Sequence, residues 1–267
     1  MSNELVWSWS RLNSLRGGID TGEGCAYGWY LTYKEGNRGI SNFFAEYGTL
    51  AHNLIEKYHK GEIFDWDIPE ELERGLNSFE FQVPFAKMKN SYYNSINDFF
   101  CVEENPFENI SFSDRFKDYE VLENELEVLF DLEGNKIKGY IDMVANHKEH
   151  GFAIVDFKSS KPYKGEKLEN NIMQLYLYCI GVKEKYGKYP DHLIYYYFRE
   201  SGQKEYMYKF DVNELERTKK FVLETIEMAR KLDKEEDFPP RCLKVDEKDF
   251  YACHLCNHRL TCKYKTK

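Results

Sequence analysis

The first region with a clear hydrophobic period covers residues 41–61. Its apolar side chains recur at the three- and four-residue spacing of a helix, at Phe44, Tyr47, Ala51, Leu54, Ile55 and Tyr58. Ser41 is the predicted N-cap and Gly61 the predicted stop, because a hydroxyl suits the free amides of a first turn and glycine suits a helix end. A second helical region, less regular and interrupted by Pro84, is predicted at about 69–100.

From Glu120 onward the period changes to that of strands. Strands are predicted at about 120–131, 136–146, 151–158, 192–199 and 204–210, separated by turn-forming residues such as Glu133-Gly134-Asn135 and Glu149-His150-Gly151. A helix beginning at Asn170 or Asn171 and ending near Gly187 follows the third strand. Another, opened by a capping box of Asp211 and Glu214, runs to about Lys234. This order predicts an α/β fold with a mixed central sheet flanked by helices.

Composition and charge narrow the class of protein. The chain has 267 residues and a formal net charge of −9, which argues against a nonspecific nucleic-acid coat but leaves room for a local basic groove. It has no apolar run of the roughly 18–20 residues that a membrane span needs, and its acidic start does not resemble a secretory signal. We therefore expect a soluble, cytoplasmic protein without a membrane partner. Seven cysteines, an odd number, favour metal binding over a disulfide framework.

The segment 151–159 carries the most informative chemistry. Asp156 and Lys158 interrupt an apolar run two residues apart, so both project from one face of a strand while Phe157 points to the other. Asp142 offers a second carboxylate in the preceding strand, and pairing of the two strands would bring both aspartates together. Such a group suits metal-assisted hydrolysis. An ion pair of Lys158 with either aspartate, closing a sheet edge, explains the same pattern.

Three further side chains could join this group. His52 borders the apolar stripe of the first helix, where a histidine is more often structural than a metal ligand. Gln174 and Tyr178 stand four residues apart, on one face of the helix after the third strand. They could contact a phosphate or hold the lysine, or they could simply be half-buried.

The carboxyl-terminal cysteines form a second candidate centre. Cys253, Cys256 and Cys262 follow a C-x2-C-x5-C pattern that offers three thiolates to one ion or cluster. The candidates for a fourth ligand are Cys25, Cys242, His254 and His258. Cys101 and Cys179 lie within apolar patterns and are expected to be buried structural residues. Cysteine spacing alone does not decide between zinc and an iron–sulfur cluster.

Taken in order, these motifs resemble the PD-(D/E)XK nuclease superfamily, in its RecB-like and Cas4-like branch. The motifs are Gly48-x3-His52, Gly139-Tyr-Ile-Asp142, Asp156-x-Lys158 and Gln174-x3-Tyr178. The predicted elements match that family's restriction-endonuclease-like αβββαβ core. Asp156 stands where the family more often has glutamate.

The resemblance implies a role for each residue. His52, Asp142, Asp156 and the backbone carbonyl of Phe157 would bind Mg²⁺ or Mn²⁺, with Glu125 as an outer carboxylate. Lys158 would be the catalytic lysine, and Gln174 and Tyr178 would support DNA binding and the active site.

The same resemblance implies a [4Fe–4S] cluster held by one cysteine before the core and three after it. These would be Cys25, Cys253, Cys256 and Cys262, with Cys242 as a spare and Zn²⁺ as the alternative metal. Ala26 stands where the family usually has proline. We thus expect a single domain, 1–267, with a core at about 41–210 and a clasp formed by about 5–34 and 235–267.

The expected function is a metal-dependent DNA nuclease, an exonuclease on DNA ends or single strands. Lys161 and Lys164 follow the candidate catalytic strand and are expected, with Gln174 and Tyr178, to contact nucleic acid. Recombination or CRISPR-adaptation proteins are the protein partners that the resemblance implies. Two alternatives stay open: a catalytically inactive nucleic-acid-binding or interaction protein on the same fold, and a zinc-clasped enzyme without an iron–sulfur cluster.

Overall fold

The structure, a computed structural model, describes residues 5–21, 24–79, 112–198, 200, 203–241, 253 and 255–264. These residues form two compact units. The described part of the first unit comprises 5–7, 47–78, 112–198, 200 and 203–219. That of the second comprises 8–21, 24–46, 79, 220–241, 253 and 255–264.

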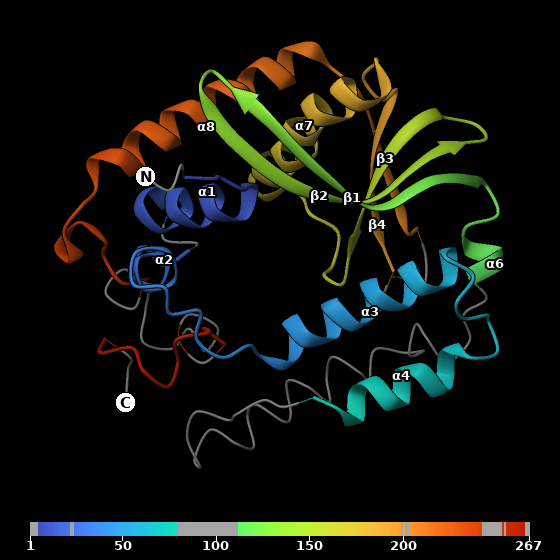
Figure 1. Ribbon diagram of the computed structural model, residues 1–267, viewed down its shortest axis with the longest axis horizontal. Helices are drawn as coiled ribbons and strands as arrows, with labels where there is room; N and C mark the ends of the chain where they lie inside the picture. Colours follow the sequence, from blue (N-terminus) through green and yellow to red (C-terminus); the bar gives the residue numbers. More distant parts are fainter. Residues whose placement is uncertain are drawn as a thin grey trace. The chain divides into compact units, whose positions relative to one another are not determined.

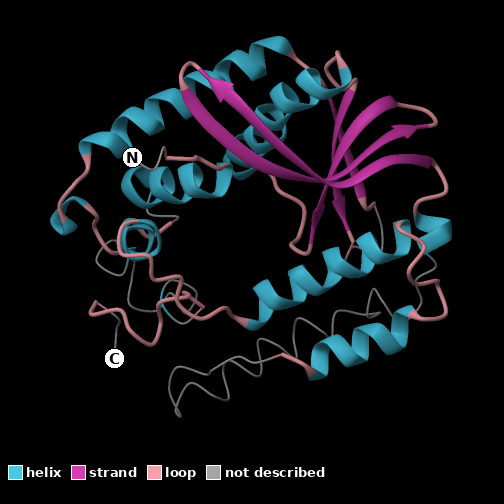
Figure 2. Ribbon diagram, viewed as in Figure 1, coloured by secondary structure: helices cyan, strands magenta, loops and turns pink. Residues whose placement is uncertain are grey.

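The first unit is built on a five-stranded mixed sheet (Figures 1 and 2). Its strands are β1 (Tyr119–Leu132), β2 (Asn135–His147), β3 (Gly151–Lys158), β4 (His192–Tyr197) and β5 (Glu205–Lys209), and they lie in that order across the sheet. Strands β3 and β4 pair in parallel, and the other neighbours pair antiparallel. The predicted α/β class and the mixed sheet are confirmed.

Helix α7 (Glu166–Tyr186) connects the two parallel strands and packs on the sheet. It begins four residues before Asn170, directly after Gly165, which has a φ of 53°, and it ends at the left-handed Gly187. Two glycines allow its close approach to the β1–β2 hairpin. A Cβ atom at Gly139 of β2 would lie 2.2 Å from the Tyr178 ring, and one at Gly181 of α7 would lie 2.6 Å from Val128.

Helix α3 (Phe43–His59) is the predicted first helix. Its N-cap is Asn42, not Ser41: the Asn42 side-chain oxygen accepts hydrogen bonds from the amides of Phe44 and Ala45, at 3.0 and 3.2 Å. Asn42 is the better placed of the two residues because it directly precedes the first helical residue.

Helix α4 (Ile68–Asn77) covers the beginning of the second predicted helical region, and the part from 80 onward, with Pro84, lies outside the described residues. The loop between α3 and α4 presents the stacked rings of Phe64 and Trp66 to solvent. Trp66 is 75% exposed, whereas Trp7, Trp9 and Trp29 are almost completely buried.

The remaining helices complete the two units. Helix α6 (Phe112–Arg115) precedes β1, and α8 (Val212–Lys231) follows β5. At the start of α8 the Asp211 side chain accepts a hydrogen bond from the Asn213 amide, while Glu214 pairs with Arg217. The predicted capping box is therefore replaced by an aspartate cap and a surface ion pair.

The second unit contains α1 (Trp9–Arg16), the π-helix η1 (Gly17–Thr21), α2 (Ala26–Tyr33) and the 3-10 helix η3 (Glu235–Asp237). Its core is aromatic: Trp29 stacks on Phe238, and Trp9 contacts Phe221. Among the described helices, none combines the length and the apolar character that crossing a membrane requires.

Candidate active site

The buried pair Asp156 and Lys158 lies at the end of β3. The Lys158 ammonium is 2.5 Å from the Asp156 carboxylate, and both side chains are largely buried. Burial raises the pKa of Asp156, even though Lys158 acts against this change. Burial alone would lower the pKa of Lys158, but the adjacent Asp156 charge outweighs it, so this pKa is raised and the ammonium stays charged.

Asp142 connects β2, β3 and α3. The β2–β3 ladder pairs Met143 with Val155, and one step further the Asp142 carboxylate accepts a hydrogen bond of 2.6 Å from the Phe157 amide. Its other oxygen lies 3.4 Å from Nδ1 of His52. Nε2 of the same imidazole is 3.1 Å from the Phe157 carbonyl oxygen. The structure thus brings together the histidine, the carboxylate and the carbonyl that the sequence singled out.

Glu125 of β1 completes a group of three potential metal ligands. One nitrogen of His52 and one carboxylate oxygen each of Glu125 and Asp142 all lie within 4.8 Å of one another. Asp156 is outside this group because its carboxylate turns to Lys158. The sequence indicated Glu125 only as an outer carboxylate of uncertain register.

The backbone of Glu125 explains how this side chain reaches the site. Its φ is 48°, a left-handed value that is rare for a side chain within a strand. On one side of it, Glu123 accepts a hydrogen bond from Tyr186 of α7, and on the other, Val128 lies against Gly181 of the same helix. Residues five apart point to opposite faces of a regular strand. The left-handed residue therefore marks the place where β1 changes the face that it turns to α7.

The charges of this group favour a bound cation. The pKa of His52 is raised to about 9: burial opposes protonation, but the Asp142 carboxylate outweighs it. The pKa of Glu125 is raised to about 6 by burial and by the nearby Asp142 charge. Both shifts mean that negative charge is concentrated in a partly buried space, where a divalent cation would relieve the repulsion. The donor set of carboxylates and an imidazole fits Mg²⁺ or Mn²⁺.

Gln174 and Tyr178 lie beside this group on α7. The Gln174 amide donates to the Tyr178 hydroxyl at 3.4 Å, and Tyr178 is 6% exposed. Burial raises the pKa of Tyr178 to about 12, so its hydroxyl keeps its proton. Lys161 and Lys164 are exposed on the loop that follows Lys158.

Sequence reasoning missed Tyr195 of β4. The Lys158 ammonium lies 5.5 Å from the centre of this buried ring, which thus helps to hold the lysine. Tyr195 belongs to a run of three tyrosines, Tyr195–Tyr197, and only the parallel pairing of β4 with β3 singles it out by placing it next to Asp156.

The side chains of Cys25, Cys253, Cys256 and Cys262 lie near one another in the second unit, within electrostatic range of Cys256. The pKa of the Cys256 thiol is raised to about 11, mainly by burial and also by the nearby Cys25, Cys262 and Cys253, while the hydrogen bond from the His258 amide acts against this change. Backbone amides point at the sulfurs: Gly28 and Arg241 donate to Cys25 at 3.3 and 3.4 Å, and His258 donates to Cys256 at 3.4 Å. Thiols in electrostatic range of one another, with amide donors to two of the sulfurs, suit a metal cluster. Among the described residues, no three of these sulfurs lie within 4.8 Å of one another, as the ligands of a single ion would. Cys242 and His254 lie outside the described residues.

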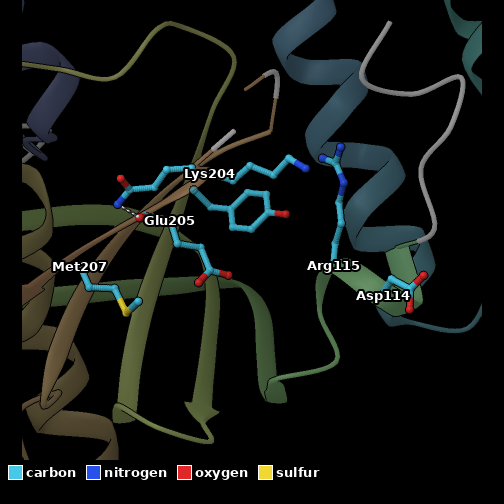
Figure 3. Close-up of a pocket in the computed structure, with 7 residues that line it drawn as sticks. Asp114, Arg115, Lys204, Glu205 and Met207 are labelled. Carbon is cyan, nitrogen blue, oxygen red and sulfur yellow. Dashed lines mark hydrogen bonds between the residues drawn. The ribbon is translucent and has the colours of Figure 1, made fainter. Parts of the chain in front are cut away.

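A separate groove of about 570 Å³ opens beside β5 in the first unit (Figure 3). It is lined by side chains of both charges, among them Asp114, Arg115, Lys204 and Glu205. The Arg115 guanidinium donates to the Phe198 carbonyl. None of His52, Asp142, Asp156 and Lys158 lines this groove, so it is distinct from the candidate active site.

A possible metal-ligand group on α3, β1 and β2, beside a buried acid–lysine pair at the end of β3, suits an enzyme of the hydrolase class. The sequence profile of the PD-(D/E)XK nuclease superfamily matches residues 17–263. The chain belongs to this superfamily.

Two solved structures are similar to this chain, and the first of them shares its fold. A protein from Eubacterium rectale named "Putative exonuclease" is 15% identical, with a TM-score of 0.50 over 98% of this chain and 91% of that chain. The crystal structure of SSO0001 is also 15% identical, with a TM-score of 0.41 over 100% of this chain and 89% of that one. A search among curated proteins gives no match.

Proposed function

We propose that this chain is a divalent-metal-dependent DNA nuclease that hydrolyses phosphodiester bonds as an exonuclease on DNA ends or single strands. One observation carries the proposal: the three-ligand group of His52, Glu125 and Asp142 lies beside the buried pair of Asp156 and Lys158. Membership of a nuclease superfamily supplies the class of substrate.

Each residue has a distinct task in this proposal. His52, Glu125 and Asp142 would hold Mg²⁺ or Mn²⁺. Asp156, which pairs with Lys158 in this structure, and the Phe157 carbonyl would join them when the metal binds. When bound, the metal supplies positive charge at the scissile phosphate and makes a bound water a better nucleophile. Lys158 keeps its proton and stabilises negative charge that develops on the phosphate, while Asp156 and Tyr195 fix its position.

The nucleic-acid contacts follow from the neighbourhood of the site. Lys161 and Lys164 are exposed on the loop after β3 and would contact the phosphate backbone. Gln174 and Tyr178, on α7, would support the active site and the bound strand. Because the net charge of the chain is −9, we expect binding to be local and sensitive to salt.

We further propose that Cys25, Cys253, Cys256 and Cys262 hold a [4Fe–4S] cluster. The convergence of their thiols and the amide donors to sulfur support a metal centre. Preference for iron over zinc rests on the resemblance to RecB-like and Cas4-like nucleases. Broad absorption near roughly 400 nm is expected of the cluster, and a colourless protein containing one zinc ion per chain would overturn this assignment.

The test of the nuclease is digestion of end-labelled single- and double-stranded DNA, with circular single-stranded DNA and RNA as parallel substrates. We expect cleavage of linear DNA that requires Mg²⁺ or Mn²⁺ and stops with EDTA, while circular DNA resists. Asp142→Asn and Lys158→Met should lower the rate by about 10²-fold or more. Lys136→Met, at an exposed position of β2, is the matched control and should leave the rate unchanged. EDTA-resistant DNA binding without cleavage by the wild-type protein would favour the inactive binding protein instead.

A further inference from the structure

The segment 255–262, which carries two of the cysteines, is bound to the residues that open helix α3. Both this segment and residues 39–45 belong to the second unit. Ile40 donates its amide to the Asn257 carbonyl at 2.8 Å. At Gly39, whose φ is 68°, a Cβ atom would lie 2.3 Å from the same carbonyl oxygen, so only glycine permits this close approach.

Arg259 is the centre of this connection. It is 2% exposed, and its guanidinium donates to three backbone carbonyls: Ile40 at 2.6 Å, Ser41 at 2.6 Å and Cys256 at 3.2 Å. A buried guanidinium is costly unless its donors are used, and its planar fork suits two neighbouring carbonyls better than an ammonium would. Arg259 therefore joins the cysteine-bearing segment to the last two residues before the N-cap.

Asn42 makes the second connection, and it uses both ends of its amide. The side-chain oxygen caps α3 by accepting from Phe44 and Ala45, while the side-chain nitrogen donates to the Leu255 carbonyl at 2.8 Å. The same residue thus starts the helix and attaches its start to segment 255–262.

We propose that Asn42 and Arg259 are positioning residues that hold the first turn of α3, and through it His52, in the geometry that binds the metal. Helix α3 is continuous from Phe43 to His59, and a rigid helix carries a constraint on its first turn along its length. This inference rests on the proposed function, because it concerns the metal affinity of the His52 group.

The experiment measures Mn²⁺ binding to the full chain by titration calorimetry, without nucleic acid. Asn42→Ser keeps a good N-cap but is too short to reach Leu255, and Arg259→Lys keeps the charge but loses the fork. We expect each to weaken Mn²⁺ binding about tenfold, the usual lower range for residues that orient metal ligands. Hydrogen exchange of the Phe44–Tyr47 amides should become faster in both variants.

A destabilised control separates positioning from a general loss of stability. Val222→Ala removes a buried side chain from α8, and we expect a lower melting temperature with an unchanged Mn²⁺ affinity. The inference is overturned if Asn42→Ser and Arg259→Lys bind Mn²⁺ like the wild type, or if Val222→Ala weakens binding equally.

His52→Ala distinguishes this inference from the proposed function. If His52→Ala weakens Mn²⁺ binding but the Asn42 and Arg259 variants do not, only the positioning role falls. If His52→Ala leaves Mn²⁺ binding unchanged, the metal site falls, and the positioning role falls with it.

Discussion

Glu125 illustrates how the conformation of one residue shapes the candidate site. A left-handed φ costs a residue with a side chain about 1–2 kcal/mol relative to the usual regions, and glycine escapes that cost. The residue nevertheless lies within a long strand and turns its carboxylate toward His52 and Asp142. We attribute this backbone conformation to the place of the Glu125 carboxylate in the ligand group.

We therefore predict an unusual order of stability at this position. Glu125→Gly should be more stable than Glu125→Ala by about 1 kcal/mol, although glycine normally weakens strands. Both variants lack the carboxylate and should bind Mn²⁺ more weakly than the wild type. Urea unfolding gives the stability order, and a more stable alanine variant would contradict the role assigned to the backbone.

Asp156 and Lys158 form a buried ion pair whose two halves depend on each other. Removing one partner leaves the other charge buried and uncompensated, which costs about 3–5 kcal/mol in typical buried pairs. Removing both charges avoids most of this cost.

The prediction is a strong coupling in a double-mutant cycle. Lys158→Met alone should destabilise the metal-free protein more than Asp156→Asn combined with Lys158→Met, since the double variant contains no buried charge at this place. Unfolding free energies of the two single variants and the double variant measure the coupling. Additive effects would show that the two charges act independently.

The strands of the first unit and its helices α3, α4 and α7 followed from the sequence, because alternating and helical patterns are strong where one face is buried. The short helix α6 was not predicted. Strands β1, β2 and β3 agree with the predicted ranges to within a few residues. Two predicted helix starts were wrong, because another nearby residue begins the helix. Asn42 caps α3 in place of its neighbour Ser41, and α7 begins directly after Gly165, before Asn170.

The site was predictable only in part. The pairing of β2 with β3 places Asp142 next to the end of β3. The sequence predicted this pairing, because it predicted the turn that joins the two strands. The left-handed backbone of Glu125 has no signal in the sequence, because glutamate has no preference for that region. The sequence offered Lys158 an ion pair with either aspartate, and only the side-chain geometry decides for Asp156, which therefore lies outside the three-ligand group.

The contact between α3 and β1 should respond to pH through His59. Its Nδ1 lies 2.9 Å from the Asn124 side-chain oxygen, and burial lowers its pKa below the usual 6.5. A depressed folded-state pKa contributes stability that is present above pH 6.5 and is lost as the pH falls through the folded-state value.

We predict that His59→Gln flattens this part of the stability profile. Between pH 7 and about pH 5, the unfolding free energy of the wild type should fall more than that of the variant. Equal slopes for the wild type and His59→Gln would remove His59 as the cause.

At the scale of the whole molecule, the cysteines differ in what they do. Cys25, Cys253, Cys256 and Cys262 interact in the second unit, whereas Cys179 lies alone on α7, buried, with its thiol donating to the Leu175 carbonyl. Hydroxyl groups replace a thiol donor well but replace a metal-binding thiolate poorly.

The corresponding prediction compares Cys256→Ser with Cys179→Ser. The first should reduce the iron or zinc content of the purified chain and lower its melting temperature, because metal binding to a folded site is also folding free energy. The second should keep the full metal content. Elemental analysis decides the matter, and full metal content in Cys256→Ser would exclude this residue as a ligand.

The tryptophans differ strongly in burial, so the intrinsic fluorescence of one of them can report on a single loop. Three of the four indole rings are no more than 3% exposed, whereas Trp66 is 75% exposed. Iodide should therefore quench one emission component, red-shifted relative to the others, that originates in the loop between α3 and α4. Trp66→Phe should abolish it, so fluorescence can follow this loop in solution without any added dye.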